Sequence, residues 1–329
     1  MLPAHVMAAA LVIALAVDRW CGEPPTRWHP VVWMGRYLGW AGWHVAPAME
    51  ERTISAGNYQ VFWLGALMWT AGAATVLAAS WLLQCFCLEL PAWGGAASAL
   101  AALLLGCLLK PLLAWRMLYR EVLAVEEALA QSLAAGRERL ALLVSRDVKA
   151  LTESEVRESA IESLAENLND SVVAPIFWFV LLGLPGAALY RFANTADAMW
   201  GYRGVWHGRN WEWAGKWAAR ADDVLSWLPA RITALLLALV TGGFNLRALR
   251  QEAHRTASPN SGWPMAAMAL GLGVCLHKPG IYALNAQGRR PKAVDTQKAI
   301  KYASNAVLAL VFIALLVIFT IAIGSCQWC

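Results

Sequence analysis

Four apolar runs limit the folds that are open to this chain. They are Pro3 to Val17, Val61 to Leu83, Ala96 to Leu113 and Val307 to Ile323. A helix needs about 20 mostly apolar residues to cross a bilayer, so the first run is short and the other three are long enough. With 59% hydrophobic and 15% charged residues, the chain lies outside the usual composition of soluble domains. The sequence therefore predicts an all-α, polytopic integral membrane protein with a single membrane-embedded domain.

Two weaker apolar runs, Val172 to Tyr190 and Leu228 to Val240, could span the bilayer, dip into it or be buried among other helices. Lys and Arg concentrate in four polar segments, 18–60, 110–170, 191–227 and 241–304. Cytoplasmic loops carry the excess of Lys and Arg, so we expect these segments in the cytoplasm and both termini outside. Crossing by both weak runs would put segment 191–227 outside, and we therefore expect neither to cross. An amphipathic helix over Trp115 to Leu143 should lie along the cytoplasmic surface.

Between Ser145 and Pro175, a dense polar helix leads directly into an apolar segment. Thr152 followed three residues later by Glu155 matches a capping box, which predicts a helix that begins near Glu153 and continues towards Pro175. One face of this helix would carry an apolar stripe of Val156, Ala160, Leu164 and Leu168. The opposite face would carry five acidic residues, Glu155, Glu158, Glu162, Glu166 and Asp170.

The acidic face has two interpretations, because carboxylates four residues apart repel each other by a few tenths of a kcal/mol. It is either solvated or covered by positive charge. Glu166, Asn167 and Asp170 lie at the edge of an apolar run, where carboxylates are costly unless they are paired or bind a cation. Clustered oxygen ligands suit Mg²⁺. Charged residues that could bind phosphate come just before the helix, namely Arg146, Asp147 and Lys149.

Other polar residues gather in the connections. They are His29 in a Pro-rich loop, Asn194, Asp197 and Arg203 within ten residues, the pair Asp222 and Asp223, Arg231, and Asn260 in a turn-rich loop. Each has a plain structural interpretation as a packed turn or an ion-pair network. Five Trp between Trp206 and Trp227 are typical of an interfacial aromatic belt. The alternative is a stacking surface for a large planar ligand.

Five stretches together resemble the motifs of one family in order along the chain. They are "GEPPTRWHPVVWMG", "SRDVKALTESEVRESAIESLAENLNDSVVAPIF", "NTADAMWGYR", "ARADDVLSWLPARI" and "SPNSGWP". The family is CobD/CbiB, the membrane-bound adenosylcobinamide-phosphate synthases of cobalamin biosynthesis, and the likeness runs from about Asp18 to Trp263. The chain departs from the family pattern at Ser145, Val148 and Ser171, where Gly, Thr and Gly are usual, and in the middle of "NTADAM". These changes remove a hydroxyl at 148 and alter the turn near 171.

The resemblance implies an ATP- and Mg²⁺-dependent amide ligation that joins a propionate carboxylate of adenosylcobyric acid to aminopropanol or its O-phosphate. A carboxylate must first become an acyl phosphate or an equivalent, which requires a metal ion, cations around the phosphates and a base for the amine. The implied catalytic residues are Glu162, Glu166, Asn167 and His29, with Glu162 or His29 as the base. The implied Mg²⁺ ligands are Glu166, Asp170 and Asp197. The implied substrate- or phosphate-binding residues are Arg146, Asp147, Lys149, Asn194, Arg203, Asp222, Asp223, Arg231 and Asn260.

The implied partners are the corrinoid, the amino alcohol or its phosphate, membrane lipid and other cobalamin-assembly enzymes. The implied location is the bacterial inner membrane, with the active site facing the cytoplasm. The net charge of +5 is explained by the cytoplasmic excess of Lys and Arg, so nucleic acid is not expected. Two alternatives stay open. A transporter would need charges at mid-membrane rather than in connections, and a non-catalytic regulatory protein of the same fold would be expected to lose the acidic residues.

Overall fold

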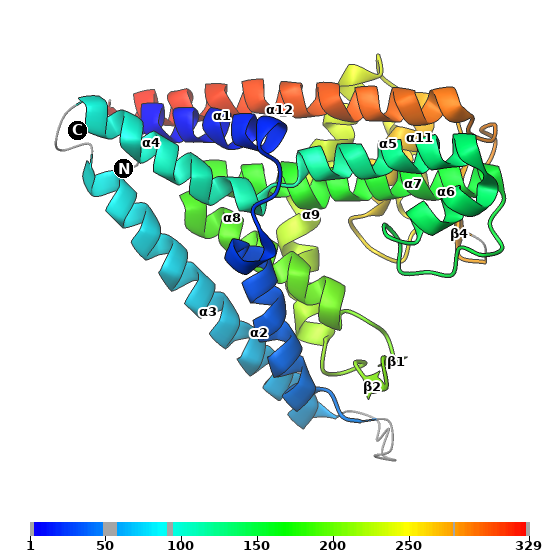
Figure 1. The fold of residues 1–329 in the computed structure, drawn as a ribbon, viewed down its shortest axis with the longest axis horizontal. Coiled ribbons are helices and arrows are strands. Elements are labelled where there is room, and N and C mark those ends of the chain that lie inside the picture. The colour runs from blue at the N-terminus through cyan, green and yellow to red at the C-terminus, as the bar shows by residue number, and fades with distance from the viewer. Residues whose placement is uncertain (1–2, 49–57, 91–94, 279, 327–329) are drawn as a thin grey trace. The chain divides into compact units, whose positions relative to one another are not determined.

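A computed structural model describes residues 3–48, 58–90, 95–278 and 280–326. Helices make up most of this part of the chain, and two short antiparallel hairpins are its only strands (Figure 1). The described residues group into two compact units. The first unit holds the chain up to Leu113, Pro175–Leu225 and the chain from Leu316 onward; the second holds Ala114–Ala174 and Ser226–Leu315. The expected all-α architecture is confirmed, and the expected single domain stays a prediction.

The first unit is built mainly from long apolar helices. These are α1 (Ala4–Trp20), α2 (Pro30–Val45), α3 (Tyr59–Glu89), α4 (Gly95–Leu109), most of α8 (Ala174–Trp200), the start of α9 (Lys216–Val240) and the end of α12 (Ala293–Cys326). Two single-turn 3₁₀ helices, η1 (Thr26–Trp28) and η3 (Lys110–Leu112), and a hairpin of β1 (Val205–Trp206) and β2 (Arg209–Asn210) complete it. Small residues let α1 and α4 pack closely: a Cβ at Gly106 would lie 2.8 Å from the Ala10 carbonyl oxygen.

The second unit contains the polar helices together with parts of the apolar ones. It holds α5 (Trp115–Gln131), α6 (Leu133–Leu140), α7 (Glu153–Leu168), a π-turn (Asn169–Val173), α10 (Leu246–Ala253), α11 (Gly262–Leu272) and the remainder of α9 and α12. A hairpin of β3 (Leu276–Lys278) and β4 (Tyr282–Leu284) pairs His277 with Ala283. The expectation of a single amphipathic helix over Trp115 to Leu143 is wrong in one detail. Ser132 is extended and its hydroxyl caps α6 by accepting from Ala135 N at 3.1 Å, so the chain forms two helices there.

Five helical segments are long and apolar enough to cross a bilayer within the described chain. They are Tyr59–Glu89, Gly95–Gln131, Glu153–Trp200, Lys216–Val240 and Ala293–Ile323. Three of the four expected spanning runs lie in these segments, whereas the first run forms the shorter helix α1 of 17 residues. Both weak apolar runs also lie in these segments. Length and composition therefore allow both to cross, and the expectation that neither crosses stays a prediction.

The capping box expected at Thr152 is confirmed, and α7 begins at Glu153. The helix does not reach Pro175 in regular form, because a π-turn over Asn169–Val173 comes first. A proline lacks the N–H that would bond the carbonyl four residues earlier, here that of Ser171. The backbone N–H of Ala114 donates to this carbonyl instead, at 3.1 Å. Ser171 also has no positive φ, so this turn does not require the glycine that is usual in the family.

Helix α8 is broken at Gly183, which has φ 72° and ψ −156°. Gln84 on α3 is buried, and its side-chain oxygen accepts a hydrogen bond from Leu184 N at 2.7 Å. A Cβ at position 183 would lie 2.2 Å from this oxygen, so both the backbone conformation and the close contact require glycine. Gln84 therefore satisfies a backbone donor that the break would otherwise leave without a partner inside an apolar segment.

Candidate functional site

Two carboxylates on the acidic face of α7 are buried. Glu158 and Glu162 are only 3% and 5% exposed, and the residues of the apolar stripe on the same helix are fully buried. The interpretation of a solvated acidic face is therefore wrong for these two carboxylates. Buried carboxylates are rare unless cations or hydrogen-bond donors surround them, so the neighbours of Glu158 and Glu162 define the site.

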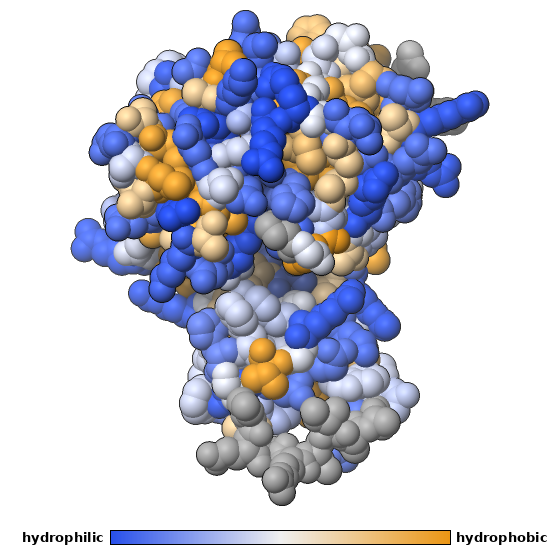
Figure 2. Space-filling view, turned by 90° about the vertical axis from the view of Figure 1, so that its right-hand side faces the viewer, coloured by the Kyte–Doolittle hydropathy of each residue, from blue (hydrophilic) through white to orange (hydrophobic). Residues whose placement is uncertain are grey.

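The β3–β4 hairpin supplies part of this surrounding. His277 donates its backbone N–H to Glu158 Oε2 at 3.2 Å, and its ring Nδ1 lies 3.7 Å from the same oxygen. Ser154, one turn earlier on α7, donates its hydroxyl to Glu158 Oε1 at 3.1 Å. The hairpin and α6 lie on the side of the molecule seen in Figure 2, where hydrophilic residues predominate.

Tyr282 connects the hairpin to two of the predicted catalytic residues. The pKa of its phenol is raised well above the usual range, first by burial and then by the negative charges of Glu162 and Glu166. Glu166 is half-buried and lies one turn after Glu162 on α7. The structure thus places both carboxylates close to one phenol, with Lys278 as a further positive charge near Glu162.

Arg146 forms an ion pair with Glu162 in which one donor and one acceptor make no hydrogen bond. Its Nη2 lies 3.3 Å from Glu162 Oε2 and also donates to the hydroxyl of Ser159. Arg146 Nη1 and Glu162 Oε1 are buried and have no hydrogen-bond partner among the described residues. A buried donor and a buried acceptor without partners are costly, and such atoms are expected where a substrate completes the site.

The remaining candidates on this segment make local contacts. Asn167 donates its amide to the Ser163 carbonyl at 3.0 Å, one turn back on its own helix. Asp170, in the π-turn, accepts from Asn169 Nδ2 at 2.8 Å. Asp147 accepts from the backbone N–H of Lys149 at 2.9 Å, and both side chains are exposed in the loop before α7. These residues flank the buried carboxylates on the same segment of chain.

Five other candidates belong to the first unit. Asn194 and Asp197 lie near the end of α8, Asp222 and Asp223 lie on α9, and Arg203 comes between the two helices. Arg191 donates to Asn194 at 3.4 Å, and the charge of Arg203 stabilises that of Asp223. The predicted Mg²⁺ ligands are therefore divided, with Glu166 and Asp170 in the second unit and Asp197 in the first.

No group of three or more His, Cys, Asp or Glu side chains that could hold a metal ion occurs within the described chain. The three-carboxylate site therefore stays a prediction. Mg²⁺ is usually held by only one or two carboxylates together with water and substrate phosphates. Glu166 and Asp170, four residues apart on the segment that follows Glu162, fit that smaller ligand set.

His29 takes part in a separate ion cluster in the first unit. Its Nε2 lies 3.1 Å from Glu23 Oε2, and Lys110 Nζ lies 2.7 Å from the same oxygen and 3.3 Å from Asp18 Oδ1. Burial alone would raise the pKa of Glu23, but hydrogen bonds from His29 and Lys110 more than offset burial and hold that pKa below its usual range. This geometry favours His29 as a member of a fixed ionic cluster rather than a free base.

The rings of the Trp-rich segment are largely occupied by contacts with neighbouring aromatic and basic side chains. The ring of Tyr202 stacks on Trp206, with centroids 4.5 Å apart and planes at 12°. Trp211 stacks on the buried Trp200 in the same manner, at 6.1 Å. The ammonium of Lys216 lies 3.7 Å from the centre of the Trp213 ring. Such pairs favour a packed aromatic layer.

Arg231 and Asn260 form a clamp in the second unit. Arg231 Nη1 donates to Asn260 Oδ1 and to the Trp227 carbonyl, both at 2.7 Å, and Nη2 donates to the Pro259 carbonyl at 3.1 Å. The guanidinium also lies between the rings of Trp227 and Trp263, 4.5 and 4.7 Å from their centres. These contacts hold the loop before α11 against α9, which favours a structural role for both residues.

Arg231→Lys should lower the free energy of unfolding by about 2 kcal/mol, because an ammonium cannot reproduce the forked hydrogen bonds of the guanidinium. Arg220→Lys, at an exposed position on the same helix, is the matched control and should change stability little. Denaturant titration of the purified protein in detergent measures both. Equal stability of the two variants would show that the clamp does not hold the loop.

The family model described as CobD/Cbib protein matches residues 11–322. The chain belongs to the CobD/CbiB family. It is 38% identical over 313 residues to the "Probable cobalamin biosynthesis protein CobD" of Methanothermobacter thermautotrophicus, covering 93% of this chain and 95% of that protein. It is 41% identical over 273 residues to the "Cobalamin biosynthesis protein CobD" of Chromobacterium violaceum, covering 82% and 81%. No solved structure matches the chain.

Several polar residues of this CobD/CbiB protein were missed by reasoning from sequence. Lys110 could have been found, because it interrupts an apolar run and a buried lysine needs a carboxylate partner. His277, Lys278 and Tyr282 had no such indication. Their partners on α7 lie more than a hundred residues earlier in the chain, and only the folded hairpin brings them together.

Proposed function

We propose that this chain is an ATP-dependent amide ligase of cobalamin biosynthesis. It would join a propionate carboxylate of adenosylcobyric acid to aminopropanol or aminopropanol O-phosphate. Membership of the CobD/CbiB family and the names of its relatives support the pathway. The observation that supports the chemistry is the buried pair of Arg146 and Glu162, in which one donor and one acceptor have no partner among the described residues.

Each group of the site has a role in such a reaction. Arg146 and Lys278 place positive charge beside Glu162, where phosphate oxygens of a bound nucleotide would gain most from it. Glu166 and Asp170 would hold Mg²⁺ together with those phosphates. When bound, Mg²⁺-ATP supplies the phosphoryl group that converts the substrate carboxylate into a better acyl donor.

Glu162 is the proposed base. An amine attacks only after its ammonium has lost a proton. Glu162 Oε1 can accept this proton, because it is a buried carboxylate oxygen that has no hydrogen-bond partner among the described residues. Arg146 holds the other oxygen and so fixes the orientation of the carboxylate. The nitrogen then forms the C–N bond, and the activated oxygen leaves with the phosphate. We place this site on the cytoplasmic side of the inner membrane, where ATP is available.

The test uses the full-length protein purified in detergent with adenosylcobyric acid, ATP and Mg²⁺. Aminopropanol and aminopropanol O-phosphate are supplied in separate reactions, and the corrinoid is analysed by mass spectrometry. The expected product has the mass of the two substrates less one water and forms only with both ATP and Mg²⁺. Absence of product with either amine would overturn the proposal and favour a non-catalytic membrane protein of the same fold.

A further inference from the structure

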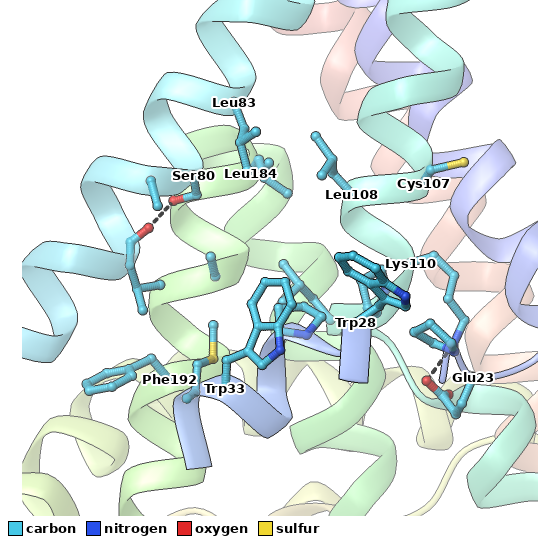
Figure 3. Close-up of a pocket in the computed structure, with 18 of the residues that line it drawn as sticks. Glu23, Trp28, Trp33, Ser80, Leu83, Cys107, Leu108, Lys110, Leu184 and Phe192 are labelled. Atoms are coloured by element: carbon cyan, nitrogen blue, oxygen red, sulfur yellow. Dashed lines mark hydrogen bonds and ion pairs between the residues drawn. The ribbon is translucent and has the colours of Figure 1, made fainter. Parts of the chain in front are cut away.

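The first unit contains a cavity of about 780 Å³, within the size range of sites for small ligands. Figure 3 shows Leu83, Leu108 and Leu184, from α3, α4 and α8, around one space, with the indoles of Trp28 and Trp33 beside it. Glu23 and Lys110 are the charged residues of the lining and meet at its edge. The cavity is thus apolar along most of its wall and ionic at one end.

The apolar wall is built partly from candidate membrane spans, and several of its residues are exposed. Helix α3 and the segment that contains α4 are both long and apolar enough to cross a bilayer. Thr75 and Ala79 on α3 line the cavity and are nevertheless exposed, and Cys107 on α4 is exposed as well. Hydrocarbon chains surround a helix that crosses a bilayer, so an acyl chain would have access to the cavity between these helices.

The ionic end brings together two carboxylates, one ammonium group and the imidazole of His29, whose Nε2 lies 3.1 Å from Glu23 Oε2. Asp18 and Glu23 both pair with Lys110, which is 2% exposed. Glu23 Oε1 is buried and has no hydrogen-bond partner in the described part of the chain. A phosphate oxygen has no proton to offer this carboxylate oxygen, whereas an ammonium group could donate a charge-assisted hydrogen bond to Glu23 Oε1.

We propose that this cavity binds one zwitterionic phospholipid with a primary ammonium headgroup, with an acyl chain along the apolar wall and the ammonium on Glu23. A headgroup of the choline type has the same charge but no N–H to donate to Glu23 Oε1. A glycerol headgroup leaves the lipid anionic. Ethanolamine phospholipids therefore fit the site better than either of the other two classes.

The test uses the full-length protein in mixed micelles with equal amounts of phosphatidylethanolamine, phosphatidylcholine and phosphatidylglycerol of identical acyl chains. Native mass spectrometry should show one retained phosphatidylethanolamine, favoured about tenfold over each of the others, because a hydrogen bond to a charged group is worth about that factor. Equal retention of the three lipids, or a preference for phosphatidylglycerol, would overturn the proposal. This comparison needs no variant.

Two variants on one helix test where the lipid binds. Ala79→Trp places an indole in the cavity and should sharply reduce lipid retention, whereas Ala78→Trp, also exposed on α3 but outside the lining, should retain the lipid. Glu23→Gln should keep retention and lose the preference for ethanolamine. The same retention in Ala79→Trp as in Ala78→Trp, with both proteins folded, would show that the lipid binds elsewhere.

Discussion

Glu162→Gln should reduce the rate of amide formation by about 100-fold or more, the usual contribution of a positioned general base. Glutamine has the same size and can still accept a hydrogen bond from Arg146, but it cannot take the proton of the attacking ammonium. The initial rate of corrinoid product formation, followed by mass spectrometry at saturating substrates, measures the effect.

Glu155→Gln is the matched control on the same helix. Glutamine at this position preserves the capping box, so both folding and rate should be unchanged. The variants Glu166→Gln and Asp170→Asn distinguish the loss of a metal ligand from the loss of the base. Losing one hard ligand should weaken Mg²⁺ binding about tenfold, and raising Mg²⁺ should partly rescue these variants but not Glu162→Gln. Near-normal turnover of Glu162→Gln would move the base away from α7, towards Asp222 and Asp223.

Arg157→Met should lower the free energy of unfolding by about 3–5 kcal/mol, which is the effect of leaving a buried charge without its partner. Arg157 donates three hydrogen bonds of 2.8–3.0 Å to Glu126, which is 9% exposed and also accepts from Thr296 Oγ1 at 2.8 Å. This network joins α5, α7 and α12 in the second unit. Denaturant titration in detergent, with loss of helical circular dichroism as the readout, measures the change.

Two comparisons make that result specific. The double variant Glu126→Gln/Arg157→Met should recover most of the lost stability, because it removes the unpaired charge as well as the pair. Arg139→Met breaks the pair with Glu121, whose two side chains are 34% and 28% exposed, and should cost less than about 1 kcal/mol. Similar losses for Arg157→Met and Arg139→Met would contradict the importance of the buried network.

The sequence predicted features that depend on residues close together in the chain. Thr152 and Glu155 form a capping box within one turn, and the stripe from Val156 to Leu168 follows from helical periodicity alone. The long apolar runs were equally plain, because a membrane span needs only length and composition. These features require no knowledge of the distant parts of the chain.

What the sequence could not predict depends on distant parts of the chain. The sequence of a run of glutamates is compatible with either a solvated or a buried face. The face is buried here because the hairpin that carries His277 and Tyr282 packs near it. Arg231 appeared to be a candidate for phosphate because its partners, Asn260 and the ring of Trp263, lie about thirty residues away. The sequence did not indicate that Gln84 accepts a hydrogen bond from Leu184 N, because the two residues are 100 positions apart.

The hydrogen bond between Gln84 and Leu184 has a consequence for biogenesis. A helix broken at Gly183 exposes backbone groups that lipid cannot satisfy, so it is unfavourable as an isolated span. Its acceptor lies 100 residues earlier and is synthesised and inserted first. Gln84 on α3 is therefore available before α8 is made, and the break at Gly183 can form against its side chain. The order of synthesis thus supplies the acceptor before the backbone donor that needs it.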